Sequence, residues 1–210
     1  MRQDVRHSLR STSLRAGSFA AALCFAGGAH AAATVTGFEA LLDGAGGTLD
    51  SFSFDNDANT IDIAKTFTSV APLTIRITVG HGTGSGGPLT VSEEITNATG
   101  QAWTDYHYDI IEPDANNGVV FTAFQQSSLS GFSLDDAPDS GPRNLDFTGA
   151  LELDGVANAA FTMSLPDPGA GNSYTFDLVQ TPTVAPIPLP PAAWLFGSAL
   201  SGMYLARRRR

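Results

Sequence analysis

Short runs in which apolar and polar residues alternate are the feature that most constrains the fold of this chain. Successive side chains of a β-strand point to opposite faces, so a period of two predicts a strand with one buried face. The clearest run places four apolar residues at alternate positions: Leu73, Ile75, Ile77 and Val79. Similar runs lie at 52–54, 61–63, 145–153, 161–165 and 174–178, and few segments before the C-terminal tail have a helical period. The pattern therefore predicts an all-β body.

Turn-forming residues separate these runs. Asp43-Gly44, Asp154-Gly155 and Asn116-Asn117-Gly118 favour chain reversal, because Gly and Asn readily adopt the backbone conformations that turns require. The spacing predicts roughly nine to eleven strands, which is typical of an antiparallel β-sandwich. An immunoglobulin-like and a jelly-roll topology both fit this pattern.

The central body, residues 32–183, has the length of a single domain and is strongly acidic. It contains three of the eleven basic residues, Lys65, Arg76 and Arg143, and all except one of the twenty-one acidic residues. Proteins bind nucleic acids with cationic surfaces, so we expect no nucleic-acid partner. We expect binding to anionic lipid or acidic polysaccharide only where a divalent cation bridges the two.

Residues 1–31 have the parts of a secretory signal peptide. Four arginines are followed by a short apolar stretch of small residues, and Ala29-His30-Ala31 matches the cleavage site of such peptides. Cleavage after this triplet would remove Cys24, the single cysteine of the chain. We therefore expect the exported protein to contain no disulfide bond and no thiolate metal site.

Residues 184–210 combine a proline-rich entry, an apolar stretch and a basic cluster. As a helix, the roughly eighteen residues from Leu189 to Ala206 would span about 27 Å, enough to cross a bilayer core. The basic cluster should stay on the cytoplasmic side, which leaves the body outside. It consists of Arg207, Arg208, Arg209 and Arg210. The tail therefore predicts a single C-terminal transmembrane helix, and by itself it also fits an anchor that is never removed.

The proline-rich entry consists of Pro186, Ile187, Pro188, Leu189, Pro190 and Pro191. Followed by the apolar stretch and the arginines, it resembles the PEP-CTERM sorting signal, in the variant whose motif reads V-P-L-P-A. Ile187 stands where that variant has Val, and Pro191 stands where it has Ala. The resemblance implies a Gram-negative bacterium and recognition by an exosortase. It also implies removal of the tail and delivery to the cell surface or the extracellular polysaccharide matrix.

Residues 89–111 are the most distinctive part of the body. Two strand-like runs flank Asn97-Ala98-Thr99-Gly100, which predicts a β-hairpin whose glycine has a positive φ. The pattern E-x-x-N-x-T-G-x-x-W-x-D-Y-H in this segment resembles one that recurs in PEP-CTERM proteins with sandwich-type bodies. Glu93 falls on the apolar face of the first run. It indicates a strand end or a β-bulge, of which the bulge is the preferred interpretation, or a buried carboxylate with a partner.

In the second run, strict alternation places Trp103, Asp105 and His107 on one face and Tyr106 and Tyr108 on the other. His107, with the carboxylate of Asp105 nearby, could be half of a catalytic dyad, but a polar strand face also explains both residues. The chain contains no G-x-S-x-G motif, and we expect no enzyme activity. If the aromatic residues are exposed, they could instead bind sugars.

One turn resembles the opening of a calcium-binding loop. Thr60 and Thr66 stand where an EF-hand requires Gly and Glu, which excludes that motif. A looser calcium site remains an alternative to a simple polar turn, and we expect no other cofactor. Its candidate ligands are Asp55, Asp57, Asn59 and Asp62.

These features lead to one main functional expectation. The chain is expected to be an exported, non-enzymatic protein of the cell surface or extracellular matrix with a structural or adhesive role. Its expected partners are an exosortase, the inner membrane through the C-terminal helix, and extracellular polysaccharide. The alternatives are a carbohydrate-binding or hydrolytic surface module and an unprocessed, tail-anchored envelope protein.

Overall fold

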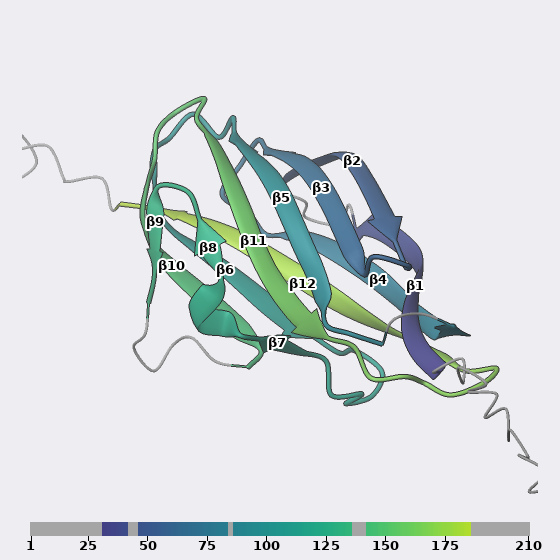
Figure 1. Cartoon of the computed structure of the whole chain (residues 1–210). Coiled ribbons are helices and arrows are strands. Elements are labelled where there is room, and N and C mark those ends of the chain that lie inside the picture. Colours follow the sequence, from purple (N-terminus) through teal and green to yellow (C-terminus); the bar gives the residue numbers. More distant parts are fainter. Residues whose placement is uncertain (1–30, 42–45, 84–85, 136–141, 186–210) are drawn as a thin grey trace, which may run out of the picture.

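A computed structural model describes residues 31–41, 46–83, 86–135 and 142–185 (Figure 1). Apart from residues 31, 184 and 185, the expected signal peptide and sorting tail lie outside the described residues. Within the described ranges, no helix is long and apolar enough to cross a membrane.

Strands dominate the described part of the chain, which confirms the all-β class. The longer strands are β1 (Ala31–Leu41), β2 (Gly47–Asp55), β3 (Thr60–Phe67), β4 (Leu73–Thr83), β5 (Leu89–Asn97), β6 (Trp103–Ile111), β10 (Asn144–Leu151), β11 (Val156–Ser164) and β12 (Ser173–Val184). The shorter elements are β7 (Val120–Thr122), the 3-10 turn η1 (Phe124–Gln126), β8 (Ser128–Leu129) and β9 (Phe132–Leu134). Strands of two or three residues are too short to show a period, which is why the sequence predicted fewer strands.

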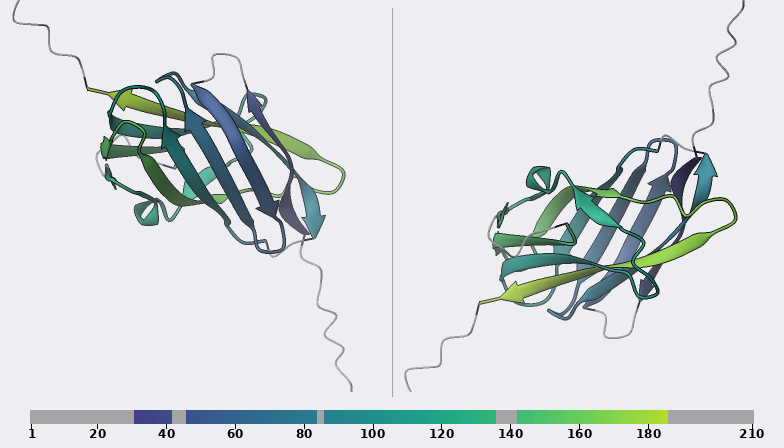
Figure 2. Two further views of the ribbon diagram at one scale, coloured as in Figure 1. Left: turned by 90° about the horizontal axis from the view of Figure 1, so that it is seen from above. Right: turned by 90° about the horizontal axis from the view of Figure 1, so that it is seen from below.

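Two sheets lie face to face in a sandwich-like arrangement (Figures 1 and 2). The first sheet has the order β1-β4-β12-β6-β10-β9. The second has the order β2-β3-β5-β11-β7, and β8 also pairs with β11. Strands β3 and β5 pair in parallel, whereas the other pairs are antiparallel. The parallel pair arises because the chain passes through β4 in the opposite sheet and then re-enters the second sheet in its original direction.

The hydrophobic core fills the space between the two sheets. The alternating apolar residues of β4 face this space as predicted, and each is fully buried. They are Leu73, Ile75, Ile77 and Val79. Burying an aliphatic side chain of this size stabilises a fold by roughly 1.5–3 kcal/mol. The two-layer arrangement therefore follows directly from the period-two pattern.

Residues 89–111 do not form the predicted hairpin. β5 belongs to the second sheet and β6 to the first, so the residues between them connect the two layers. The buried side chain of Asn97 holds this connection, because its amide nitrogen donates to the carbonyl of Gln101 (2.8 Å) and its oxygen accepts from the Thr99 hydroxyl (2.7 Å). Gly100 has the predicted positive φ, 78°. The hairpin prediction was wrong because each run buries its apolar face from a different sheet.

A β-bulge at the start of β6 changes the face that Trp103 occupies. Opposite β6, Thr183 pairs with Asp105 and Val184 pairs with Trp103, so β6 advances by two residues where β12 advances by one. Trp103 therefore lies on the buried face together with Tyr106. The predicted grouping of Trp103 with Asp105 was wrong because strict alternation assumes an unbroken register.

Candidate functional site

Five polar side chains meet in the interior between the two sheets. The second sheet contributes Lys65 of β3 and Glu93 of β5, while the first contributes Tyr106 and Tyr108 of β6 and Gln180 of β12. Each of the five is at most 3% exposed. We refer to these five residues as the Lys65 cluster.

Glu93 lies in a regular stretch of β5. Its pairing with β11 and with β3 continues without a register shift, so the predicted bulge at this position was wrong. The alternative interpretation, a buried carboxylate with a partner, is confirmed. The partner is Lys65, whose Nζ lies 2.6 Å from the Glu93 Oε2, and both side chains are 0% exposed.

The Glu93 carboxylate faces two different nitrogen atoms. Its Oε2 accepts from the Lys65 Nζ, and its Oε1 accepts from the Gln180 Nε2 at 3.1 Å. Lys65 also donates directly to the Gln180 Oε1. An amine, a carboxamide and a carboxylate therefore contact one another pairwise.

Two tyrosine hydroxyls complete the hydrogen bonding of the cluster. Tyr106 donates to the Gln180 Oε1 at 2.9 Å, and Tyr108 donates to the Glu93 Oε2 at 2.7 Å. The Lys65 Nζ also lies 5.6 Å from the centroid of the Tyr108 ring, within the range of a cation–π contact. Every polar side-chain group of the cluster thus has a partner, which reduces the cost of burying it.

Burial sets the electrostatics of the cluster. Loss of solvent lowers the pKa of Lys65 to about 8, although the neighbouring Glu93 carboxylate partly opposes this effect. Burial and the same carboxylate raise the pKa values of Tyr106 and Tyr108 well above their ordinary value. Low polarity favours the neutral form of each group. The Lys65 amine is therefore much closer to its nucleophilic form than a lysine on the surface.

Aromatic rings enclose the cluster. The Phe67 ring meets Trp103 and Tyr106 edge-on, with centroid distances of 5.4 and 5.9 Å. The Phe161 ring meets Tyr108 at 4.9 Å. These contacts join the cluster to the apolar core and shield it from bulk water.

Asp105 and His107 do not contact each other in the described hydrogen bonds. His107 Nδ1 lies 2.5 Å from the carboxylate of Asp146, the residue opposite it on β10. The Asp105 carboxylate accepts from the hydroxyls of Thr104 and Thr183. The structure thus couples His107 to a carboxylate that the sequence did not indicate, across two neighbouring strands.

The aromatic residues considered for sugar binding belong to the core. Trp103 is 1% exposed, and Tyr106 and Tyr108 are 0% exposed. Their rings pack against one another, with centroids 5.6 Å apart for Trp103 and Tyr106 and 5.1 Å apart for Tyr106 and Tyr108. They do not form an aromatic floor accessible to a sugar.

The candidate calcium ligands lie on and next to the turn between β2 and β3. The Asp55 Oδ1 accepts from the backbone N–H groups of Asp57 and Ala58, which stabilises the turn. Asn59 has a φ of 53° and donates to the carbonyl of Gly87. Asp62 follows on the exposed side of β3. In the described part of the chain, no group of three or more His, Cys, Asp or Glu side chains is placed to hold a metal ion.

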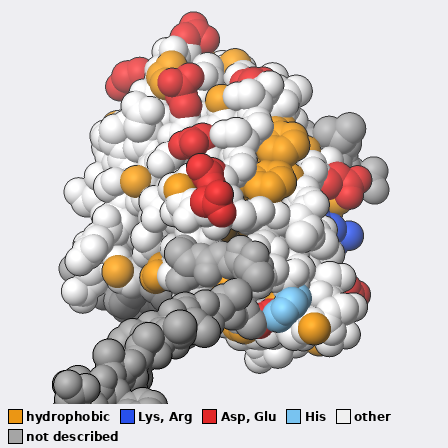
Figure 3. Space-filling model, turned by 45° about the vertical axis from the view of Figure 1, so that its right-hand side comes forward, with side chains coloured by type: hydrophobic (Ala, Val, Ile, Leu, Met, Phe, Trp, Pro, Cys, Tyr) orange, Lys and Arg blue, Asp and Glu red, His pale blue; other side chains and the backbone are white. Residues whose placement is uncertain are grey.

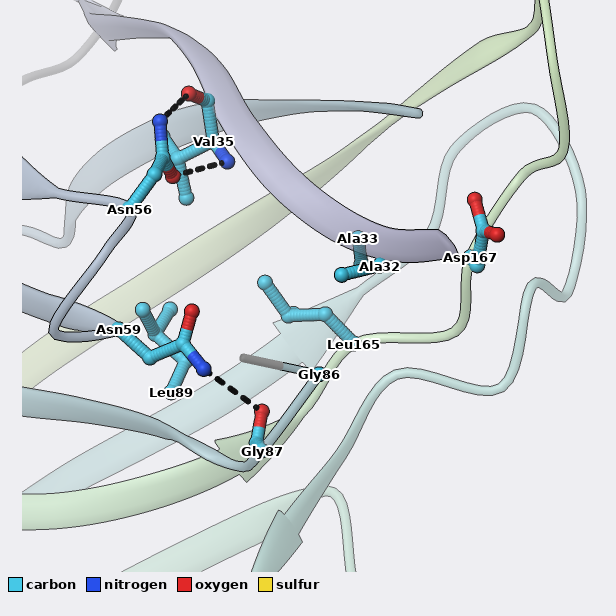
Figure 4. A pocket seen from close by; sticks show the side chains of 10 residues that line it. All are labelled: Ala32, Ala33, Val35, Asn56, Asn59, Gly86, Gly87, Leu89, Leu165 and Asp167. Atoms are coloured by element: carbon cyan, nitrogen blue, oxygen red, sulfur yellow. Dashed lines mark hydrogen bonds between the residues drawn. The ribbon is translucent and has the colours of Figure 1, made fainter. Parts of the chain in front are cut away.

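A shallow pocket of about 140 Å³ opens between β1, this turn and the loop before β5 (Figure 4). Asn56 at its edge both accepts from the Val35 N–H (2.9 Å) and donates to the Val35 carbonyl (3.0 Å). Typical small-molecule sites have volumes of roughly 300–1,000 Å³. The asparagine side chains of this pocket hold neighbouring backbone segments together, Asn56 at Val35 and Asn59 at Gly87.

Acidic side chains predominate among the charged residues on the face drawn in Figure 3. Each basic residue within the described ranges forms an ion pair. Besides Lys65, Arg76 contacts Asp177 through two hydrogen bonds of 2.7 and 2.9 Å, and Arg143 contacts Glu112.

Hydrophobic rings are also exposed at one side of the sandwich. Phe38 of β1 stacks on Phe52 of β2 with a centroid distance of 4.7 Å, and Phe52 remains 46% exposed. This pair joins the neighbouring edges of the two sheets.

The sequence interpretation identified Glu93 but missed Lys65 and Gln180. Both occupy inward positions of otherwise apolar alternations, Lys65 after Ile61 and Ile63 and Gln180 after Phe176 and Leu178. Polar residues at such positions in separate strands were the available signal. Their convergence depends on the sheet topology, which the sequence did not provide.

In comparisons with known proteins, no family model, no curated protein and no solved structure matches this chain.

Proposed function

We propose that the chain is an exported, non-enzymatic component of the cell surface or extracellular matrix, with a structural or adhesive role. The proposal combines a body built as a sealed two-sheet sandwich with the sorting pattern of its two ends. The observation that carries the role of the body is the position of its aromatic residues. The aromatic residues considered for sugar binding, Trp103, Tyr106 and Tyr108, lie in the core around a buried hydrogen-bonded cluster.

We propose that the ends determine the destination of the protein. The signal peptide, residues 1–31, would direct export, and residues 184–210 would enter the inner membrane as a helix. The arginines at the C-terminus would hold the tail on the cytoplasmic side. An exosortase would then cut near the proline-rich entry and release the body to the surface or to the polysaccharide matrix.

The acidic body suits this environment. Its basic residues are all engaged in ion pairs, and its surplus of carboxylates keeps exported copies soluble and mutually repelling. Contact with acidic polysaccharide would then require bridging divalent cations. An immunoglobulin-like or a jelly-roll assignment of the sandwich would not alter this role.

The cleavage step is tested by the intact mass of the protein recovered from the cell surface of a host with an exosortase. We expect a mass that lacks the tail from the region of residue 190 onward, and retention of Arg207–Arg210 in an isogenic host without the enzyme. Replacing the four arginines with serine should reduce the surface yield. Surface protein that keeps its arginines in the host with the enzyme would instead support a permanent anchor.

The role of the body is tested in the same host by deletion and complementation. We expect loss of the gene to weaken matrix cohesion. A chain carrying His107→Gln and Asp146→Asn should restore cohesion, because a structural role does not need this pair. Failure of the folded double variant to restore cohesion would favour the hydrolytic alternative.

A further inference from the structure

We propose that Lys65 and Gln180 become joined by an intramolecular isopeptide bond, formed by the protein itself with Glu93 as the proton carrier. The bond would link the Lys65 Nζ to the Gln180 Cδ and connect the two sheets through the core. This inference stands apart from the proposed function, since it concerns chemistry within the fold and can be tested in any expression host.

The first requirement for such a bond is contact between the amine and the amide. The Lys65 Nζ is hydrogen-bonded to the Gln180 Oε1, and the amide carbon is only one carbonyl bond, about 1.2 Å, beyond that oxygen. Lys65 projects into the core from β3 of the second sheet, and Gln180 projects into it from β12 of the first. Holding two reactants in place in this way replaces a slow encounter by a reaction within one molecule.

The second requirement is a group that moves a proton from the amine to the leaving nitrogen. Glu93 meets this requirement because its Oε2 accepts from the Lys65 Nζ, while its Oε1 faces the Gln180 Nε2. The same carboxyl group can therefore remove a proton on one side and deliver a proton on the other.

The third requirement is stabilisation of the negative charge that develops on the amide oxygen. The Tyr106 hydroxyl already donates to the Gln180 Oε1 at 2.9 Å. Such a donor, fixed in an interior of low polarity, stabilises a tetrahedral intermediate far better than water does. Tyr108 also holds the Glu93 carboxylate in place, through a 2.7 Å hydrogen bond to its Oε2.

The reaction balances without any external reagent. Transfer of one proton from the Lys65 ammonium to Glu93 gives a neutral amine and a carboxylic acid. The amine attacks the Gln180 Cδ, a new N–C bond forms, and the Cδ–Nε2 bond breaks. The second amine proton passes through Glu93 to the departing nitrogen, which leaves as ammonia. The products are a secondary amide, ammonia and protonated Glu93, with no oxidation or reduction.

The direct test is the intact mass of the full chain, purified in folded form after its terminal residues have been identified. We expect a mass lower than that of the sequence by one ammonia, about 17 Da, as an amide formed from an amine and a carboxamide requires. Digestion should yield a branched peptide that contains both Lys65 and Gln180. The linked chain should also migrate faster in denaturing electrophoresis, because a covalent loop keeps it compact.

Three variants separate this bond from other losses of ammonia. Lys65→Met and Glu93→Gln should both have the full mass, the second because it keeps the shape of Glu93 but cannot accept a proton. Arg76→Gln, outside the cluster, should keep the deficit. Asn117-Gly118 can also lose ammonia by forming a succinimide. Brief alkaline treatment hydrolyses a succinimide but leaves an isopeptide bond intact.

Two results would overturn the proposal. One is a folded, unsubstituted chain that keeps its full mass even after prolonged incubation at mildly alkaline pH. The other is a deficit that persists in Lys65→Met or maps to Asn117-Gly118. If Lys65→Met does not fold, the folded Glu93→Gln variant decides the question by circular dichroism and mass together.

Discussion

Two ion pairs in this molecule have nearly the same length but very different surroundings. Lys65 and Glu93 are 2.6 Å apart in the core, and Arg76 and Asp177 are 2.7 Å apart across the neighbouring strands β4 and β12. Both side chains of the first pair are fully buried, whereas the Arg76 side chain is 35% exposed and that of Asp177 is 11% exposed. The comparison shows that distance alone does not reveal what a charge pair does.

The surroundings decide the behaviour of each pair. Around Arg76, the Asp177 carboxylate raises the pKa of the guanidinium, so the pair stays charged. Around Lys65, burial lowers the pKa of the amine even though the Glu93 carboxylate opposes this shift. The Arg76–Asp177 pair is a partly exposed charged contact, whereas the Lys65–Glu93 pair belongs to a buried arrangement that also contains a carboxamide.

The largest difference should come from removing one partner of each pair. In a Gln180→Met background, where no isopeptide bond can form, Lys65→Met leaves the Glu93 carboxylate without its cation, and breaking a buried pair in this way costs about 3–5 kcal/mol. Denaturant titration should show this loss in the free energy of unfolding. If Lys65→Met is no more destabilising than Arg76→Gln, the contrast between the pairs fails.

A matched double variant sharpens this result. Lys65→Met with Glu93→Leu removes both charges and should recover the part of the loss that came from the unpaired carboxylate. An isopeptide bond would close a loop of 115 residues, worth about 5 kcal/mol in the chain-entropy account of cross-links. A double variant as stable as the unsubstituted chain would argue against such a link.

A smaller change in the free energy of unfolding should appear with pH in a variant that cannot form the isopeptide bond. Burial lowers the pKa of Lys65 from its ordinary value of 10.5 to about 8 in the fold, and Gln180→Met should keep the amine buried while the bond cannot form. Between these values the unfolded state binds more protons, so the free energy of unfolding should rise with pH, by about 2 kcal/mol between pH 7.5 and 9.5. Comparison with Gln180→Met/Lys65→Met from pH 7.5 to 9.5 isolates this contribution. A slope that survives the second substitution cannot arise from Lys65.

The smallest effect should belong to the surface pair. Arg76→Gln should lower the thermal midpoint less than Lys65→Met does, because the Arg76 end of the pair is open to solvent although Asp177 is only 11% exposed, and high salt should reduce the difference. Melting curves at low and high ionic strength measure this directly. A large change that does not depend on salt would show that Arg76 contributes through packing.

The sequence predicted the class of fold well because the class depends on a local property. The alternation around Ile75 and Ile77 specifies a strand and its buried face without reference to the rest of the chain. The positive φ of Gly100 was also predicted correctly, since it depends on backbone freedom at one residue. The pairing of strands was not predictable in the same way. β5 and β6 are neighbours in sequence, yet they lie in different sheets.

The candidate site could be predicted only in part. Glu93 was recognisable as a polar residue at a buried position, but its partner was not, because Lys65 lies 28 residues away. The prediction for Trp103 was wrong because the bulge between Trp103 and Asp105 reverses the face that Trp103 occupies at the start of β6. A local pattern identifies an unusual residue, whereas only the topology shows what the residue meets.

The position of β12 has a mechanical consequence. This strand lies between β4 and β6 and runs antiparallel to both, and Gln180 is close to its end at Val184. Tension applied through the chain beyond Val184 would load two rows of hydrogen bonds in shear. These bonds would therefore have to break together rather than one after another. A covalent cross-link at Gln180 would transmit that force to β3 within a few residues, so most of the sandwich would bear little of it.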